Sequence, residues 1–253
     1  DRESGLGTFY YEYDEMQRTQ PWLDSDDGAL EVEVRDAVTT LPHLPETVAE
    51  LREVGMGTDR RIGAEFLEAG LGFGGSCFPK DVRALEHMAS VNGCHPKLLR
   101  AVMDVNYYQR LRVVQKVRDL LGAVRDKTIG VLGLAFKPNT DDIRDSASIH
   151  VINSLLYEDA IIQAYDPIAM ENAGKVLSSN VKFCKNAYEA AEGADALVIA
   201  TDWNEFKHLD LDAMKSSMRQ PIVIDGRNIY EPEVVRQKGF IYYGIGRGTL
   251  ETE

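Results

Sequence analysis

The sequence is short of cysteine and of long apolar runs. Its 253 residues include 3 cysteines, at positions 77, 94 and 184, and no C-x-x-C pair. So sparse and odd a set is typical neither of a disulfide framework nor of a zinc site, and it indicates a reducing compartment. No apolar run is long enough to cross a bilayer, and none opens the chain as a signal peptide would. We therefore expect a cytoplasmic protein with no metal site and no membrane partner.

Basic residues are also in deficit. Lys and Arg number 28 against 41 Asp and Glu, which gives a net charge of −13 and a pI near 4.9. This balance argues against a nucleic-acid partner and against an anionic membrane surface. An anionic ligand would need a local basic pocket, so any cluster of Arg and Lys becomes informative. The hydrophobic share of 44% is ordinary for a globular chain long enough for one large domain or two modest ones.

The chain divides into three segments by pattern. Residues 1–46 are unassigned and contain no Gly-rich phosphate loop. Residues 47–122 form a mainly helical segment, with helices expected over 79–93 and 96–121, the longer one ending at Gly122. Residues 123–253 alternate short apolar runs with helical patterns.

That alternation predicts an α/β fold. Strands are expected at 128–134, 161–165, 181–183, 196–200, 222–225 and 240–244, with helices at 146–157, 187–192, 211–218 and 234–238. Buried strands alternating with helices are typical of a Rossmann-like parallel sheet covered on both faces. Ligands of such sheets bind beyond the carboxyl ends of the strands. Those ends are residues 135–137, 166–167, 201–202 and 225–227. The G-x-x-G at 130–133 is only a weak indication of dinucleotide binding.

A glycine-rich stretch leads into the most reactive side chain of the sequence. Residues 72–81 are G-F-G-G-S-C-F-P-K-D, and five glycines lie between Gly63 and Gly75. Cys77 precedes a helix that Pro79 is suited to begin, so the helix dipole and nearby Lys80 both favour a thiolate. Asp81 is close enough to orient a water or accept a proton. On spacing alone, a catalytic thiol and a buried cysteine behind a tight turn are equally good interpretations.

The exact sequence of residues 72–81 favours the catalytic thiol over the buried cysteine, because it resembles the active-site loop of the UDP-glucose and GDP-mannose dehydrogenases. The resemblance runs from about residue 47 to 246 and includes D-R-R-I-G at 59–63, G-L-A-F-K-P-N-T-D-D-I-R-D-S at 133–146 and D-G-R at 225–227. Several separate motifs in the right order make coincidence very improbable. Phe78 and the 136–146 string are more similar to the UDP-glucose group; the GDP-mannose group stays open as an alternative.

The resemblance implies a reaction. Enzymes of this family oxidise the C6 alcohol of UDP-glucose twice, each time passing a hydride to NAD. Cys77 would add to the intermediate aldehyde as a thiohemiacetal and then carry a thioester, which water hydrolyses to UDP-glucuronate. By match to the motif, Asp81 would help position or activate that water.

It also implies binding residues. Arg forks suit phosphate and carboxylate oxygens, and the family's substrate-binding arginines match Arg61, which would reach the neighbouring subunit's substrate, and Arg227. Arg144 could instead have a purely structural role, in an ion pair with Asp141, Asp142 or Asp145. The helix at 96–121 matches the family's dimerising helix, so a homodimer is expected. The remaining implied residues are Glu68, Ala69, Gly70, Leu71, Gly72, Phe73, Gly74, Phe136 and Lys137 for the substrate, and Lys80 and Arg144 for NAD.

The resemblance breaks in residues 1–46, which do not match the family's N-terminal NAD domain. The central helix that carries a catalytic lysine and asparagine in the family is likewise unmatched before Thr47. Two hypotheses follow. The chain is an enzyme, or the catalytic-thiol part of one completed by another chain; alternatively, it is a sugar-nucleotide-binding remnant without turnover. Binding of NAD would distinguish them.

Overall fold

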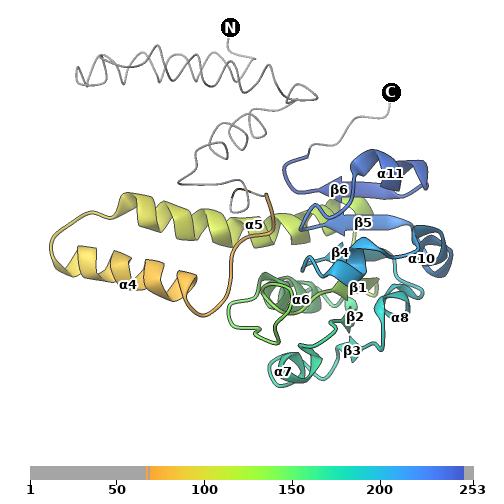
Figure 1. Cartoon of the computed structure of the whole chain (residues 1–253), viewed down its shortest axis with the longest axis horizontal. Helices are drawn as coiled ribbons and strands as arrows, with labels where there is room; N and C mark the ends of the chain where they lie inside the picture. The colour runs from red at the N-terminus through yellow and green to blue at the C-terminus, as the bar shows by residue number, and fades with distance from the viewer. Residues whose placement is uncertain (1–66, 68, 248–253) are drawn as a thin grey trace, which may run out of the picture. The chain divides into compact units, whose positions relative to one another are not determined.

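The computed structural model describes residues 67 and 69–247, which contain two long helices followed by a parallel α/β sheet (Figure 1). The sheet has the order β3-β2-β1-β4-β5-β6, and every adjacent pair of strands is parallel. The chain order therefore reverses between β1 and β4, which is where ligands of such sheets bind. The strands are β1 (Thr128–Leu132), β2 (Ile161–Tyr165), β3 (Lys182–Phe183), β4 (Ala196–Ile199), β5 (Ile222–Asp225) and β6 (Ile241–Gly244).

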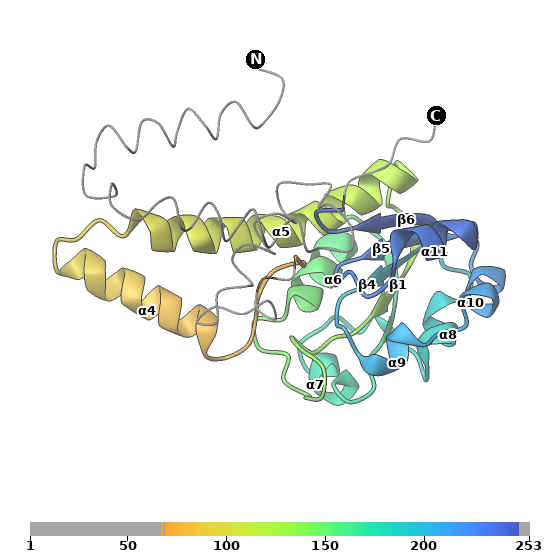
Figure 2. The same cartoon turned by 45° about the horizontal axis from the view of Figure 1, so that its top comes forward.

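Helices cover both faces of this sheet (Figure 2). On one face, valines of α5 and α6 pack on alternate strand residues such as Val131 and Val198. On the other face, Phe206, Met214 and their neighbours pack on the intervening residues. The helices are α4 (Phe78–Val91), α5 (Lys97–Leu121), α6 (Ala147–Tyr157), α7 (Met170–Gly174), α8 (Ala187–Ala191), α9 (Asn204–Lys207), α10 (Leu211–Ser217) and α11 (Pro232–Gln237).

The long helix α5 connects the thiol-bearing helix with the sheet. Its C-terminal half buries Val113, Val114 and Val117 in the core beside α6. Its N-terminal half pairs with α4, where Arg100 donates to Glu86 at 2.7 Å. Leu98, at the start of α5, remains 76% exposed within the described part of the chain. The C-terminal half of α5 is thus part of the core, whereas its N-terminal half, residues 97–108, is largely exposed and is called the arm of the helix.

The predicted fold class is confirmed. Each strand and helix expected between residues 79 and 244 is present within a few residues of its expected bounds, whereas α7 and α9 were not expected. The domain boundaries at residues 46 and 122 stay predictions. No helix in residues 67 and 69–247 is long and apolar enough to span a membrane.

Candidate functional site

The glycine-rich loop crosses the carboxyl edge of the sheet and is fixed at the end of β5. The Leu71 N–H donates to the Gly226 carbonyl at 3.0 Å, and the Leu71 side chain is fully buried. A Cβ on Gly226 would lie 2.1 Å from Leu71 Cδ2, so the loop and the strand end are in contact without room for a side chain. The Asn228 amide also donates to the Ala69 carbonyl at 3.2 Å.

Glycine is required at several positions of this loop. Gly72 has a φ of +104°, and a Cβ there would lie 2.6 Å from Asn106 Oδ1. A Cβ on Gly74 would lie 2.4 Å from the Asp145 carbonyl oxygen, and one on Gly75 (φ +90°) 2.8 Å from the Phe136 ring. The loop therefore lies with its bare backbone against α5, the 141–145 segment and Phe136.

Cys77 is the residue that immediately precedes α4, and its side chain is exposed. The Asp81 N–H donates to the Cys77 carbonyl at 2.8 Å, so the thiol stands at the positive end of the helix dipole, as the sequence predicts. Ser76 Oγ lies 3.7 Å from Cys77 Sγ. Of the other two thiols, Cys94 is exposed after α4, and burial raises the pKa of Cys184. Cys77 is thus the one thiol placed at a helix start.

Two charged side chains follow it in the first turn of α4. Lys80 Nζ lies 3.2 Å from Asp81 Oδ1, and the two side chains are 72% and 67% exposed. Because Asp81 is four residues after Cys77, both lie on the same helix face. A carboxylate, an ammonium group and a thiol are therefore accessible together.

Arg144 lies beside the glycine-rich loop that ends at Cys77 (residues 69–77, the thiol loop) and makes two kinds of contact. Its carbonyl accepts from the Gly75 N–H at 2.9 Å. Its guanidinium pairs with Asp142 at 2.7 Å, which realises the ion-pair alternative considered for it. The hydrogen bonds that Arg144 donates to Asp142 raise the pKa of Arg144. The carbonyl of Arg144 thus fixes the loop two residues before Cys77.

Arg227 and Phe136 join the ends of β5 and β1. Arg227 Nε donates to the Ala200 carbonyl at 3.0 Å and Nη2 to the Phe136 carbonyl at 3.3 Å. A Cβ on Gly70 would lie 3.3 Å from Arg227 Nη1, so the guanidinium reaches the thiol loop. Desolvation lowers the pKa of Arg227. Lys137, in contrast, is exposed, with Nζ 5.5 Å from the centre of the Phe136 ring.

The turn after β1 is occupied by a carboxylate of the protein itself. Asp166, at the end of β2, is fully buried and accepts from the N–H groups of Leu134 at 2.7 Å and Ala135 at 3.1 Å. It also accepts from Trp203 Nε1 at 3.1 Å. These amides would otherwise form the phosphate-binding turn of a dinucleotide fold. The G-x-x-G of residues 130–133 is therefore not a free pyrophosphate site.

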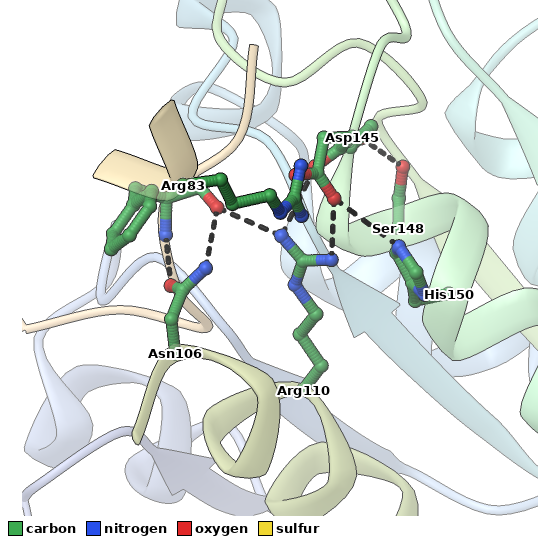
Figure 3. A network of polar contacts seen from close by, with 8 residues as sticks. Arg83, Asn106, Arg110, Asp145, Ser148 and His150 are labelled. Carbon is green, nitrogen blue, oxygen red and sulfur yellow. Dashed lines mark hydrogen bonds and ion pairs between the residues drawn. The ribbon is translucent and has the colours of Figure 1, made fainter. Parts of the chain in front are cut away.

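A polar cluster beneath the loop contains residues that the sequence analysis did not select (Figure 3). Asn106 Nδ2 and Arg110 Nη2 both donate to the Phe73 carbonyl, at 3.0 and 2.9 Å. Arg110 Nη1 also donates to Asp145 Oδ1 at 2.9 Å. The signal was present: Asn106 and Arg110 occupy the helical stripe that continues as Val113 and Val117, so two polar residues interrupt a buried face.

The described structure thus brings most of the predicted residues together. Residues 70–75 contact Phe136, Arg144 and Arg227, and Cys77, Lys80 and Asp81 follow at the start of α4. Lys137 is exposed, and Arg61 and Glu68 lie outside the described residues. Within the described ranges no group of His, Cys, Asp or Glu has the arrangement of a metal site.

Comparison with known proteins identifies the family of the chain. The family model for the central domain of the UDP-glucose/GDP-mannose dehydrogenase family matches residues 47–108, and the model for its UDP binding domain matches residues 130–232. UDP-glucose 6-dehydrogenase TuaD of Bacillus subtilis (strain 168) is 46% identical over 193 residues, 76% of this chain and 42% of the relative. The chain therefore spans less than half the length of that relative.

Solved structures agree. A UDP-glucose dehydrogenase from Pyrobaculum islandicum superposes with a TM-score of 0.68 at 38% identity, covering 76% of this chain and 42% of that one. A UDP-D-ManNAc dehydrogenase from Pyrococcus horikoshii gives a TM-score of 0.65 at 30% identity, covering 87% and 47%. Sequence, fold and site geometry lead to one conclusion: the chain belongs to the UDP-glucose/GDP-mannose dehydrogenase family.

Proposed function

We propose that this protein binds UDP-glucose at the carboxyl edge of its sheet and takes part in the NAD-dependent oxidation of the sugar to UDP-glucuronate, with Cys77 as the nucleophile. The observation that carries the proposal is the placement of Cys77. Its exposed thiol ends a loop that is fixed to the end of β5 and that lies against Arg227 at Gly70 and against Phe136 at Gly75. A ligand bound at the strand ends is within reach of that thiol.

The nucleotide would be held by charge and by bare backbone. Arg227 is half-buried at the strand ends, and a guanidinium fork suits the oxygens of a diphosphate. The loop over residues 69–74 presents glycine backbone, which can approach a sugar or phosphate closely. In a chain of net charge −13, these groups supply the local positive field that an anionic ligand needs.

The residues around the thiol fit a second, anionic ligand. Lys80 and Arg144 are exposed cations, respectively near Cys77 in the chain and beside its loop, and each is balanced only by a neighbouring carboxylate in the described part of the chain. They would hold the cofactor near the reacting carbon. NAD, when bound, accepts the hydride lost from C6 in each oxidation. Because Asp166 fills the turn after β1, we expect the pyrophosphate of NAD to bind elsewhere than at that turn.

The protein's own residues would then do the covalent chemistry. The Cys77 sulfur adds to the aldehyde carbon formed by the first oxidation, and the carbonyl oxygen gains a proton, which gives a thiohemiacetal. After the second oxidation the same carbon is a thioester. Water attacks it, the C–S bond breaks, and Cys77 leaves as a thiol, a good leaving group. Asp81, on the same face of α4, is placed to accept the proton of that water.

We also propose a homodimer formed through α5. Within the described chain, the arm of this helix exposes the apolar residues Leu98, Val105, Tyr107 and Tyr108. Monomeric proteins rarely expose so many large apolar side chains together. A second copy of the same helix, with the same apolar character, is the partner we expect.

The test follows NADH absorbance with purified chain, UDP-glucose and NAD, in parallel with calorimetry using UDP-glucose. Growth of absorbance that is lost in Cys77→Ser, with unchanged UDP-glucose binding, supports the enzyme. Binding without absorbance supports the alternative, a sugar-nucleotide-binding part that needs another chain for turnover. Loss of binding in Cys77→Ser would mean that the thiol is structural. Activity with GDP-mannose in place of UDP-glucose would support the GDP-mannose alternative.

A further inference from the structure

The cluster beneath the thiol loop is centred on a buried arginine. Arg110, on α5, is 5% exposed. Its Nη2 donates to the Phe73 carbonyl at 2.9 Å and to the Asp145 carbonyl at 3.2 Å, and Nη1 donates to Asp145 Oδ1 at 2.9 Å. Its Nε has no acceptor in the described part of the chain. Removing a guanidinium from water costs several kcal/mol, so its retention here calls for a role.

Asp145 has a backbone conformation that suits its contact with Arg110. The residue has a φ of +50°, which is uncommon outside glycine, and its side chain is 17% exposed. In this conformation its carboxylate and its carbonyl both accept from Arg110. Burial opposes ionisation of Asp145, but its bonds with Arg110 and Arg83 outweigh that effect and lower its pKa. The carboxylate is thus ionised and fully engaged.

The pair lies where three parts of the chain converge (Figure 3). Arg110 comes from α5, and Asp145 from the segment that follows Phe136 and Arg144. Asp145 Oδ2 also accepts from Arg83 of α4 at 3.0 Å, and α4 is the helix that begins at Cys77. The helix after the thiol is therefore tied directly to this carboxylate, and the loop before the thiol is tied to it through Arg110.

The thiol loop needs such a hold because it has few side chains of its own. Gly72, Gly74 and Gly75 leave its backbone free to adopt many conformations. Phe73 is fixed on both sides of its α-carbon: its N–H donates to Asn106 Oδ1 at 2.7 Å, and its carbonyl accepts from Asn106 and Arg110. Reacting groups misplaced by about 1 Å lose roughly 100-fold in rate.

We propose that Arg110 and Asp145 are a positioning pair, which sets the place of Cys77 relative to the sugar-nucleotide site without touching the substrate. The inference builds on the proposed function, because the position that it fixes is the one from which the thiol meets bound sugar.

The experiment uses the three cysteines of the full chain as reporters. Each variant is treated with iodoacetamide, with and without UDP-glucose, and alkylation at Cys77, Cys94 and Cys184 is followed by peptide mapping. UDP affinity is measured by calorimetry in parallel. The principal variant is Arg110→Met/Asp145→Asn, because removing both charges leaves no unpaired buried ion. The matched control is Arg118→Met/Glu158→Gln, which removes a more exposed arginine–carboxylate pair that joins the same helix, α5, to the end of α6.

UDP-glucose should slow the alkylation of Cys77 in the wild-type chain. In the principal variant, the factor by which UDP-glucose slows this reaction should be smaller by about tenfold or more. UDP affinity, the alkylation rate of exposed Cys94 and the inertness of buried Cys184 should be unchanged, and the control should behave as wild type. Unchanged Cys77 protection would overturn the proposal. So would alkylation of Cys184, since the pair would then hold the whole fold rather than the thiol.

Failure of the proposed function gives a different result. If wild-type chain binds neither UDP nor UDP-glucose, the substrate assignment is wrong, and the positioning pair is judged on the ligand-free rates alone. The ratio of Cys77 to Cys94 alkylation must then differ by about threefold or more between wild type and the principal variant, as a displaced side chain implies. Equal ratios would refute the pair as well.

Discussion

Replacing Gly72 by alanine tests whether the thiol loop depends on close contact with α5. Two costs are expected. The first is backbone strain, because a φ of +104° is unfavourable for an L-residue by about 1–3 kcal/mol. The second arises because the new Cβ would lie 2.6 Å from Asn106 Oδ1 and displace the amide. Asn106 makes two hydrogen bonds to Phe73, each worth about 0.5–1.5 kcal/mol.

Gly93→Ala is the matched control. Gly93 also has a positive φ, +78°, but nothing lies within 4 Å of a Cβ built there. It should therefore show only the strain, about 1–2 kcal/mol. The loss of unfolded-state entropy caused by alanine is common to both variants and cancels in the comparison. We expect Gly72→Ala to be the more destabilising by about 1–3 kcal/mol, the worth of the Asn106 bonds.

Urea unfolding of the two variants and wild type measures this difference directly. The reasoning also requires that Gly72→Ala, and not Gly93→Ala, alters alkylation of Cys77. Equal stabilities for the two variants would refute it, because the contact with Asn106 would then contribute nothing.

Three further predictions concern other parts of the site. Burial, followed by the charge of Arg110, lowers the pKa of His150 below its usual value near 6.5. As pH drops below about 6.5, the imidazole is therefore protonated more readily in the unfolded chain than in the folded one, and the free energy of unfolding should fall. Urea midpoints across that pH range should fall less steeply in His150→Gln. Arg227→Ala should weaken UDP binding by about tenfold or more in calorimetry, since a charge-assisted bond is worth about 1.5–3 kcal/mol, and undiminished affinity would remove Arg227 from the site. Light scattering at micromolar concentration should give a dimer that Leu98→Glu/Val105→Glu dissociates; a wild-type monomer would contradict the α5 interface.

Much of the fold could be predicted because its elements carry simple periodicities. Runs such as residues 196–200 are fully apolar and flanked by turn residues, so a buried parallel strand was the natural interpretation. The helices α7 and α9 were missed because five and four residues are too few to show a helical period; α8 is as short, but its alanines favour a helix. Apolar residues of the 79–93 helix do not mark a buried face, since Leu85 and Met88 are exposed in the described structure.

The site was predictable where a local motif carries it and obscure where distant segments meet. The loop around Cys77 is contiguous and highly specific. Arg110 and Asp145, in contrast, are 35 residues apart and meet only because α5 packs beside the 141–145 segment. Asp145 was considered only as a partner for Arg144, whereas Asp142 takes that place. No single-sequence pattern indicates which of several neighbouring aspartates faces a buried arginine.

Calorimetric titration with the 6-aldehyde of UDP-glucose tests the central claim most directly, because it needs no NAD. If the sugar nucleotide binds at the sheet edge with C6 facing Cys77, the thiol adds to the aldehyde and the wild-type chain should bind it at least about tenfold more tightly than UDP-glucose, a difference of 1.4 kcal/mol. Cys77→Ser should bind the aldehyde and UDP-glucose equally. Equal affinities in the wild-type chain would contradict the account, because the thiol would then not reach the carbon that it is proposed to attack.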